Sequence, residues 1–248
     1  GRDVSSIYEV PLTIYKQNAG RLIKDRLKIK KTPQLGTLKK FIKNYKNPKS
    51  EVTIAMCGKY TELIDSYKSV MEAFVHAGVE NNARVNIKWI QTEKIKNLKD
   101  VEKVFPNING VLILPGFGSR GSEGKIKIVK YSRENKVPFL GICLGLQCAV
   151  IEFARNVCKM QGANSTEFNS KTQYPVIDLM ESQRAIKIKG GTMRLGAYEC
   201  EIKVGTKAYS AYGEKKISER HRHRYEVNNR YKKTLEKNGL VISGINQE

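Results

Sequence analysis

The sequence predicts an α/β fold: a doubly wound, mostly parallel sheet with flanking helices and an antiparallel extension in the C-terminal half. Near-continuous apolar runs occur at Gly110–Pro115 and Pro138–Cys143, as strands buried on both faces require. A helix with a clear apolar face, Gly145–Val157, follows the second run directly. After about Gly162 the pattern changes to alternation of apolar and polar residues, which is typical of half-exposed antiparallel strands.

Strands and helices alternate in the first part of the predicted domain. Alternating apolar residues at Val52–Met56, stopped by Gly58, predict the first strand. Apolar residues on one face predict a helix over Asp65–Ala77, with Gly78 as its C-cap. Next come a strand at Val85–Ile90, the apolar run at 110–115, a loop at Gly116–Gly124, a helix at Lys125–Glu134, and the second apolar run with its helix. This order predicts parallel strands joined by helical crossovers.

The C-terminal part shows shorter candidate strands. They lie at Ala185–Lys189, Tyr198–Val204, Arg224–Val227 and Leu240–Ile242. Their alternating polarity indicates antiparallel pairing with one face in water.

Composition excludes several classes of protein. The 248 residues suffice for one large domain or two small ones. No run approaches the ~20 apolar residues of a membrane helix, and Gly1–Pro11 has no apolar segment of a secretory signal. The five cysteines are scattered and form no C-x-x-C pair, which argues against a disulfide scaffold and against a zinc site. We therefore expect a cytoplasmic protein without a bound metal.

The net charge of +21 is concentrated near the N-terminus. Lys16–Lys49 holds twelve Lys or Arg residues and one acid, Asp25. Such a run could bind nucleic acid or an anionic membrane. Like-charged blocks without interleaved aromatic residues, however, favour a solvated and extended linker. We therefore interpret Gly1–Lys49 as a tail and basic linker, with one short amphipathic stretch at Leu35–Tyr45, and expect an ordered domain from Ser50 onwards.

The candidate for chemistry is Cys143. It follows a predicted strand and precedes a predicted helix within Gly141-Ile-Cys143-Leu-Gly145, the cysteine form of a nucleophile elbow. Such a turn strains the backbone, and the helix N-terminus favours a thiolate. The N–H of Leu144 would be one oxyanion donor and Gly116, at another strand end, the candidate second donor. The alternative is a small buried apolar residue, which is our interpretation of the other cysteines: Cys57, Cys148, Cys158 and Cys200.

The elbow, extended to Gln147, resembles the glutaminase elbow of the class-I glutamine amidotransferases. Flanking segments resemble the CTP synthase family within that class, over essentially the whole chain. These segments are Asp3–Pro11, Pro115–Lys125, Ala163–Phe168, Gly190–Gly196 and Glu219–Asn228. The resemblance implies that Gly1–Lys49 is the tail of a synthase domain plus a linker, and that Ser50–Glu248 is the glutaminase domain without its C-terminal end.

The resemblance also implies roles for single residues. Cys143 would attack the side-chain amide of glutamine, release ammonia and leave a thioester for water to hydrolyse, while Leu144 and Gly116 would donate to the oxyanion. The implied substrate-binding residues are Gly116, Leu144, Gly145, Leu146, Gln147, Glu167 and Arg224, and the implied lid residues are Thr192 and Arg194. Glu167 would accept from the α-ammonium, so we expect Glu167 and Arg224 to converge on Cys143. Without the resemblance, these two would be interpreted as an ordinary salt bridge and Gly190-Gly191 as a hairpin turn.

For the whole enzyme, the resemblance implies amination of UTP to CTP in a homotetramer. ATP, Mg²⁺ and the activator GTP would serve the full enzyme, and the glutaminase domain would need no cofactor. The partners would be L-glutamine and the synthase domain, with no membrane and no nucleic acid. Two alternatives stay open: an idle glutaminase fold acting as a basic nucleic-acid-binding or scaffold module, and a glutaminase serving another synthase.

Two features depart from the family pattern. One glycine, Gly116, precedes Phe117 where the family has two. The sequence stops before a Phe-His-Pro-Glu-like segment that would supply the base, and none of His76, His221 and His223 replaces it. We expect this segment to be truncated or disordered. A chain without it should hydrolyse glutamine at least ~100-fold more slowly than one that has it.

Overall fold

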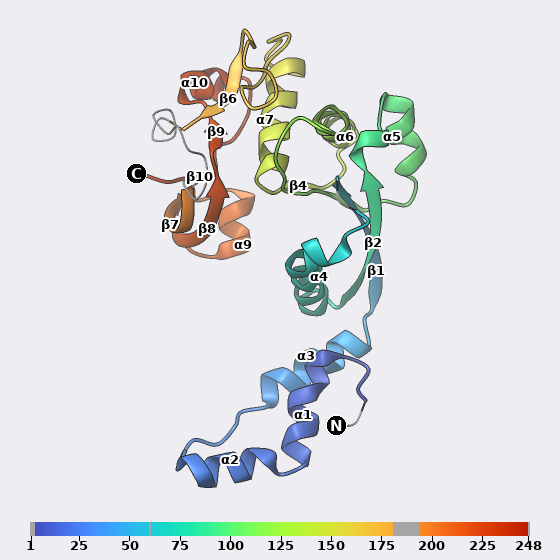
Figure 1. Cartoon of the computed structure of the whole chain (residues 1–248), viewed down its shortest axis with the longest axis vertical. Coiled ribbons are helices and arrows are strands. Elements are labelled where there is room, and N and C mark those ends of the chain that lie inside the picture. Colours follow the sequence, from blue (N-terminus) through green and yellow to red (C-terminus); the bar gives the residue numbers. More distant parts are fainter. Residues whose placement is uncertain (1–2, 60, 181–193, 248) are drawn as a thin grey trace. The chain divides into compact units, whose positions relative to one another are not determined.

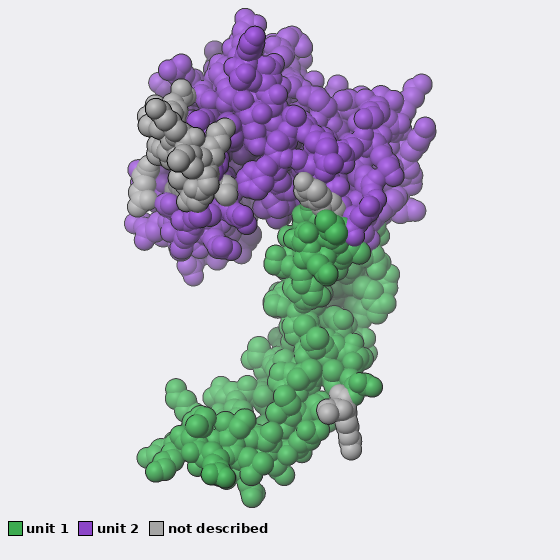
Figure 2. Space-filling model, in the orientation of Figure 1, with its two compact units in different colours: residues 1–53, 63–86 green, residues 54–62, 87–248 purple. Residues whose placement is uncertain are grey.

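The computed structural model describes residues 3–59, 61–180 and 194–247, and its elements are labelled in Figure 1. The chain forms two compact units, coloured green and purple in Figure 2. One unit comprises Gly1–Thr53 with Leu63–Asn86, and the other Ile54–Glu62 with Ile87–Glu248. Among the described residues, no helix has the length and apolar character needed to span a membrane. The domain boundary expected at Ser50 stays a prediction.

The first unit is built mainly of helices. In chain order these are η1 (Ile7–Glu9), α1 (Val10–Lys16), α2 (Ala19–Leu27), α3 (Gly36–Lys46), η2 (Ile64–Tyr67) and α4 (Lys68–Glu80). The expectation of an extended linker was therefore wrong for much of Gly1–Lys49, because Lys and Arg are good helix formers and apolar residues recur between them. The expected amphipathic stretch is confirmed as α3, which packs against α4 and buries Ile42.

A small polar cluster fastens the N-terminal segment to α4. The Tyr8 hydroxyl donates to Glu72 Oε2 over 2.5 Å and lies 2.8 Å from His76 Nε2. The Phe41 ring lies against both Tyr8 and His76, with centroids 4.6 and 5.5 Å away. Burial, followed by the hydrogen bond to Glu72, raises the pKa of Tyr8 to about 12. His76 is thus a helix-surface residue in a local network.

Gly78 does not cap its helix. The helix α4 continues to Glu80, and Asn81 is its C-cap residue. A Cβ at Gly78 would lie 2.5 Å from the carbonyl oxygen of Ala83, the first residue of β2 (Ala83–Gln91). Glycine is therefore required here by the close approach of the next strand, which a pattern of single residues does not reveal.

The main sheet has the order β2-β1-β3-β4. It is formed by β1 (Ser50–Gly58), β2, β3 (Gly110–Ile113) and β4 (Phe139–Gly141), of which β1, β3 and β4 run parallel. The connecting helices are α5 (Leu98–Val104), α6 (Ser122–Glu134) and α7 (Leu144–Asn156). The predicted α/β architecture is confirmed, and β3 is buried throughout. Leu140 of β4 is nonetheless 60% exposed, because β4 is the outer strand of this sheet.

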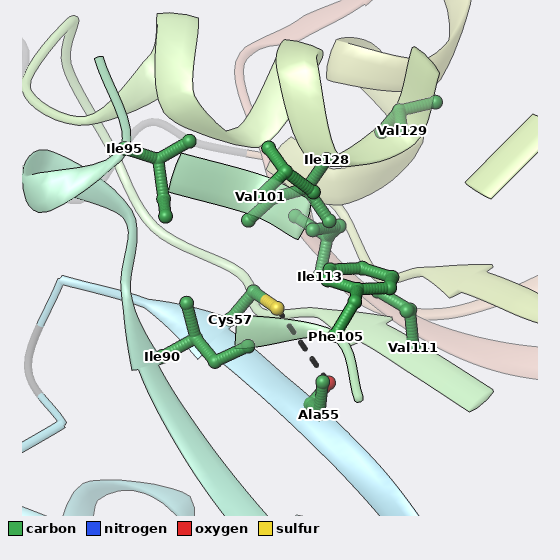
Figure 3. Packing of buried hydrophobic residues seen from close by; sticks show 10 residues of the cluster. All are labelled: Ala55, Cys57, Ile90, Ile95, Val101, Phe105, Val111, Ile113, Ile128 and Val129. Atoms are coloured by element: carbon green, nitrogen blue, oxygen red, sulfur yellow. Dashed lines mark hydrogen bonds between the residues drawn. The ribbon is translucent and has the colours of Figure 1, made fainter. Parts of the chain in front are cut away.

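Two apolar clusters flank α6 and α7. Figure 3 shows the first, in which Cys57 and Ile113 from the sheet meet Val101 of α5 and Ile128 of α6. The second joins α7 to the C-terminal elements and includes Leu144, Cys148 and Ile151. Both cysteines are fully buried, as expected for structural thiols. Together the clusters hold the carboxyl ends of β3 and β4 in place, where the candidate site lies.

The C-terminal elements form two small sheets in which three of the four strand pairs are antiparallel and one short pair is parallel, which confirms the antiparallel extension. One has the order β10-β7-β8, with β7 (Arg194–Ile202), β8 (Lys216–His223) and β10 (Gly244–Ile245). The other has the order β5-β6-β9, with β5 (Asn164–Ser165), β6 (Pro175–Leu179) and β9 (Tyr225–Val227); the helices α9 (Lys207–Tyr212) and α10 (Asn229–Lys237) complete this part. The strand expected at Leu240–Ile242 was wrong, because Leu240 packs on the α7 cluster and pairing begins at Gly244. Ala185–Lys189 lies outside the described residues.

A buried ion pair joins α6 to α7. Glu152 is 1% exposed and accepts two hydrogen bonds from Arg133 Nε and one, at 2.8 Å, from Arg133 Nη2. Asn156 Nδ2 adds a fourth bond to Glu152 Oε1 over 3.0 Å. Removing one partner of a buried ion pair destabilises the protein, because the other charge is left without its counter-charge.

Replacing Glu152 by Gln should lower the free energy of unfolding by about 3 kcal/mol, since Arg133 then loses its buried anion. Glu134→Gln is the matched control, because Glu134 also accepts from Arg133 Nη2, at 3.3 Å, but is exposed. The control should change stability by less than about 0.5 kcal/mol. Thermal unfolding of both variants measures the difference, and equal shifts would contradict the role of burial.

Candidate active site

Cys143 lies in a strained turn between β4 and α7. It is the N-cap residue of α7, with φ 53° and ψ −105°. A non-glycine residue rarely adopts a positive φ, and such strain clusters at functional sites. The predicted elbow is therefore confirmed for its place and its strain. The Cys143 side chain is half-buried.

The two glycines of the elbow permit close backbone approach. A Cβ on Gly145 would lie 2.4 Å from the carbonyl oxygen of Ile113, the last residue of β3. A Cβ on Gly141 would lie 2.5 Å from the backbone of Gly145 itself. The first turn of α7 thus rests directly on the ends of β3 and β4, which brings Cys143 to the loop that follows β3.

Backbone N–H groups from two strand ends face the Cys143 sulfur. Burial raises the pKa of the Cys143 thiol above its ordinary value, and the Glu167 carboxylate adds to that rise. The N–H groups of Leu144 and Gly116 and the charge of Lys125 act in the opposite direction. The two predicted oxyanion donors therefore both favour a negative charge on this sulfur, and their role toward a substrate oxygen stays a prediction.

Glu167 reaches the loop after β3 from a distant part of the chain. Its Oε1 accepts a hydrogen bond of 2.6 Å from the N–H of Gly118. Its backbone N–H donates to the hydroxyl of the buried Ser165 at the end of β5, which fixes the turn that carries it. The charge of Glu167 acts on the Cys143 thiol, and its role toward a substrate stays a prediction.

Gln147 and Tyr225 form the wall beside Glu167. Gln147 is 7% exposed, and its Nε2 donates to the Tyr225 carbonyl over 3.0 Å. Its Oε1 is buried without a hydrogen-bond partner among the residues that the structure describes. Burial, together with the charge of Glu167, raises the pKa of Tyr225, whereas Arg224 lowers it. The charges of Glu167 and Arg224, both predicted site residues, therefore act on Tyr225.

The other predicted site residues are placed less closely. Gly145 is buried and Leu146 is 52% exposed. Arg224 joins β8 to β9, and its carbonyl accepts from the Met180 N–H over 3.0 Å. Arg194 begins β7 opposite His223, and Thr192 lies outside the described residues.

The histidines of β8 interact with each other. His221 Nδ1 lies 2.9 Å from His223 Nε2, and the ring of Tyr198 meets His221 edge-on. Arg222, between them, instead turns its carbonyl to Cys143, with the sulfur 3.9 Å from that oxygen. A backbone carbonyl can accept the thiol proton in a weak hydrogen bond but is not a base.

Sequence reasoning missed two contributors to the site. One is the Arg222 carbonyl, which a sequence cannot reveal because every residue carries the same group. The other is Lys125, which was expected to begin a helix but lies in the first turn of the longer α6 with its side chain fully buried.

Comparisons with known proteins agree with this geometry. Residues 62–248 match the family model "Glutamine amidotransferase class-I". The chain is 52% identical over 246 residues to the CTP synthase of Chlorobaculum tepidum, covering 98% of this chain and 44% of that protein. It is also 52% identical over 249 residues to the CTP synthase of Methanocaldococcus jannaschii, covering 98% of this chain and 46% of that protein. The chain thus spans less than half the length of these relatives.

A solved structure shares the fold. It is described as the glutaminase domain of Trypanosoma brucei CTPS with bound acivicin. It is 36% identical, with a TM-score of 0.73, and the match covers 79% of this chain and 75% of that chain. The resemblance to CTP synthases expected from the sequence motifs is confirmed by these relatives. Because the family model matches most of this chain, the chain belongs to the class-I glutamine amidotransferases.

Proposed function

We propose that this chain hydrolyses the side-chain amide of L-glutamine through a thioester on Cys143. The single observation that carries the proposal is the strained elbow, with the N–H groups of Leu144 and Gly116 directed at the nucleophile. The thiolate would attack the amide carbon, and the two N–H groups would hold the oxyanion. Collapse of the intermediate would release ammonia and leave the thioester, which water would convert to glutamate and free thiol.

Two side chains near Cys143, and a third that acts on Tyr225, suit the rest of the substrate. Glu167 uses Oε1 for Gly118 and offers its other oxygen and its charge to the α-ammonium. The buried Oε1 of Gln147 would accept an N–H donor of bound glutamine, which would satisfy an otherwise unpaired polar atom. Arg224, which acts on the same Tyr225, would contribute a further polar contact.

The thiol needs a proton acceptor. Because burial raises the pKa of Cys143, only a small fraction is thiolate at neutral pH. A neighbouring imidazole would both take this proton and return it to the leaving ammonia. The resemblance assigns this task to a His–Glu pair, and that assignment stays a prediction.

The proposal is tested by ammonia release from L-glutamine by the full-length protein. Steady production of ammonia and glutamate in equal amounts supports the proposal. No release, combined with salt-sensitive binding of RNA, would favour the alternative of a basic binding module built on an idle fold.

Replacing Glu167 by Gln should raise KM for glutamine about 10- to 100-fold, since a charged hydrogen bond is worth about 1.5–3 kcal/mol. The same change should lower the pKa of Cys143, because the Glu167 charge now raises it. Alkylation of Cys143 at pH 7 should therefore become faster while glutamine binding becomes weaker. Glu123→Gln is the matched control, because Glu123 pairs with Arg155 and is exposed. An unchanged KM in Glu167→Gln would contradict the substrate role.

For the longer enzyme, we propose that the ammonia serves the ATP-dependent amination of UTP to CTP. The names of the relatives support this proposal. Formation of CTP from UTP, ATP and glutamine by the full-length protein tests it. The cytoplasmic location and the homotetramer implied by the resemblance stay predictions.

A further inference from the structure

Lys125 is a charged side chain enclosed by the protein. It is 0% exposed, and its Nζ donates to the Leu114 carbonyl over 3.0 Å. Among the described residues, no carboxylate forms an ion pair with it. An ammonium taken out of water without an anion is destabilising by several kcal/mol. The fold therefore retains a costly charge at this position.

The Lys125 ammonium lies directly under the loop that carries Gly116. Leu114 follows β3, and its own N–H donates to the Cys57 carbonyl over 3.0 Å. Its carbonyl accepts from Lys125, so both the N–H and the carbonyl of Leu114 are held at the start of the loop. A Cβ on Gly116 would come within 3.8 Å of Lys125 Nζ.

The far end of the loop is fixed in the same manner. Lys59 Nζ donates to the Phe117 carbonyl, and the N–H of the same peptide group, on Gly118, donates to Glu167. Gly116 thus lies between two peptide groups that are each held by a side chain. Its N–H has little freedom to turn away from Cys143.

We propose that Lys125 is the positioning residue of the oxyanion site and also its fixed counter-charge. Its bond to Leu114 keeps the Gly116 N–H directed at Cys143, and its ammonium attracts the anion that forms on the sulfur. The role of Lys125 toward an anion on the substrate oxygen rests on the proposed glutaminase function. Its effect on the Cys143 thiol does not depend on that function.

Of the three described thiols that act on Lys125, Cys143 is the one that can supply the missing anion during a reaction. Burial lowers the pKa of Lys125, the charge of Lys59 lowers it further, and the thiols of Cys148, Cys57 and Cys143 oppose this. Burial raises the pKa of Cys148 to about 12 and that of Cys57 higher still, so both stay neutral. Cys143 is half-buried at the site and is the thiol that can ionise.

The test is the pH dependence of Cys143 alkylation in the full-length protein carrying Lys125→Met. Iodoacetamide is the probe, and peptide mass spectrometry assigns the rate to Cys143. Loss of the ammonium should shift the apparent pKa of Cys143 upward by about one pH unit, with alkylation about 10-fold slower at pH 7. Lys125→Arg keeps the positive charge, so its rate of Cys143 alkylation should depend on pH nearly as in the original protein. Lys127→Met, on the same helix and partly exposed, should leave the curve unchanged.

Thermal unfolding separates this role from a structural one. Met has nearly the length of Lys and removes an unpaired buried charge, so Lys125→Met should fold with an unchanged or higher Tm. In the same variant, kcat for glutamine hydrolysis should fall about 10-fold while KM stays within twofold. A lower Tm with an unshifted alkylation curve, or a variant that does not fold, would overturn the proposal. If the original protein released no ammonia, the glutaminase function would fail, yet the alkylation shift would still test Lys125.

Discussion

Replacing Cys143 by Ala is expected to lower ammonia release from glutamine at least ~10⁴-fold, because alanine at this position cannot form the thioester. The loss should appear in kcat, and the binding residues around the site should still hold glutamine. Cys158→Ala is the matched control: Cys158 is partly buried behind α7, and its loss should change the rate by less than about twofold. Activity above ~1% in Cys143→Ala would contradict the assignment.

The same position should also show the strain of the elbow. A glycine adopts a positive φ without an energetic cost, whereas alanine, like cysteine, is strained there. At φ 53°, Cys143→Gly should therefore be more stable than Cys143→Ala, by about 1 kcal/mol. Thermal unfolding of the two inactive variants compares them directly. Equal stabilities would show that the turn is relaxed.

Replacing Gly145 by Ala is expected to have the second-largest effect. The added Cβ would lie 2.4 Å from the Ile113 carbonyl oxygen and 3.0 Å from its Cβ, so β3 and α7 must separate. We expect a loss of about 3 kcal/mol in stability, the upper range for overpacking, and at least ~100-fold in glutaminase rate because the oxyanion donors move apart.

Gly36→Ala is the matched control for Gly145→Ala. A Cβ at Gly36 meets no atom within 4 Å, and the residue begins α3. This change should be neutral or slightly stabilising, by less than about 1 kcal/mol. Thermal unfolding and ammonia release measure both variants. A Gly145→Ala protein with unchanged Tm and rate would contradict the close contact.

The fold was predictable from sequence where burial dictates residue type. The run at Gly110–Pro115 predicts β3 because a strand covered on both faces admits few polar residues. The helix α7 follows from its apolar periodicity. Within Gly1–Lys49 the helices α1 and α2 were missed, because the high charge of the segment was interpreted as an extended linker. The strand β6 (Pro175–Leu179) was missed because its five residues carry little pattern.

The site was predictable only in its local part. Cys143, Leu144 and Gly116 follow from the elbow and from the rule that function gathers at strand ends. Glu167 comes from the turn after β5, in another part of the chain, and its place was reached through the family resemblance rather than through periodicity. Lys125 was missed because a lysine is almost always exposed, so a sequence gives no reason to place one inside. Its role depends on three-dimensional packing alone.

Labelling with acivicin, the compound bound in the related Trypanosoma brucei structure, tests the central claim most directly. The full-length protein would be incubated with the compound, digested and mapped by mass spectrometry, with and without L-glutamine. Our account predicts one covalent adduct, on the peptide that contains Cys143, with slower labelling when glutamine is present. An adduct on another residue, or labelling that glutamine does not slow, would contradict the claim that Cys143 is the nucleophile of a glutamine site.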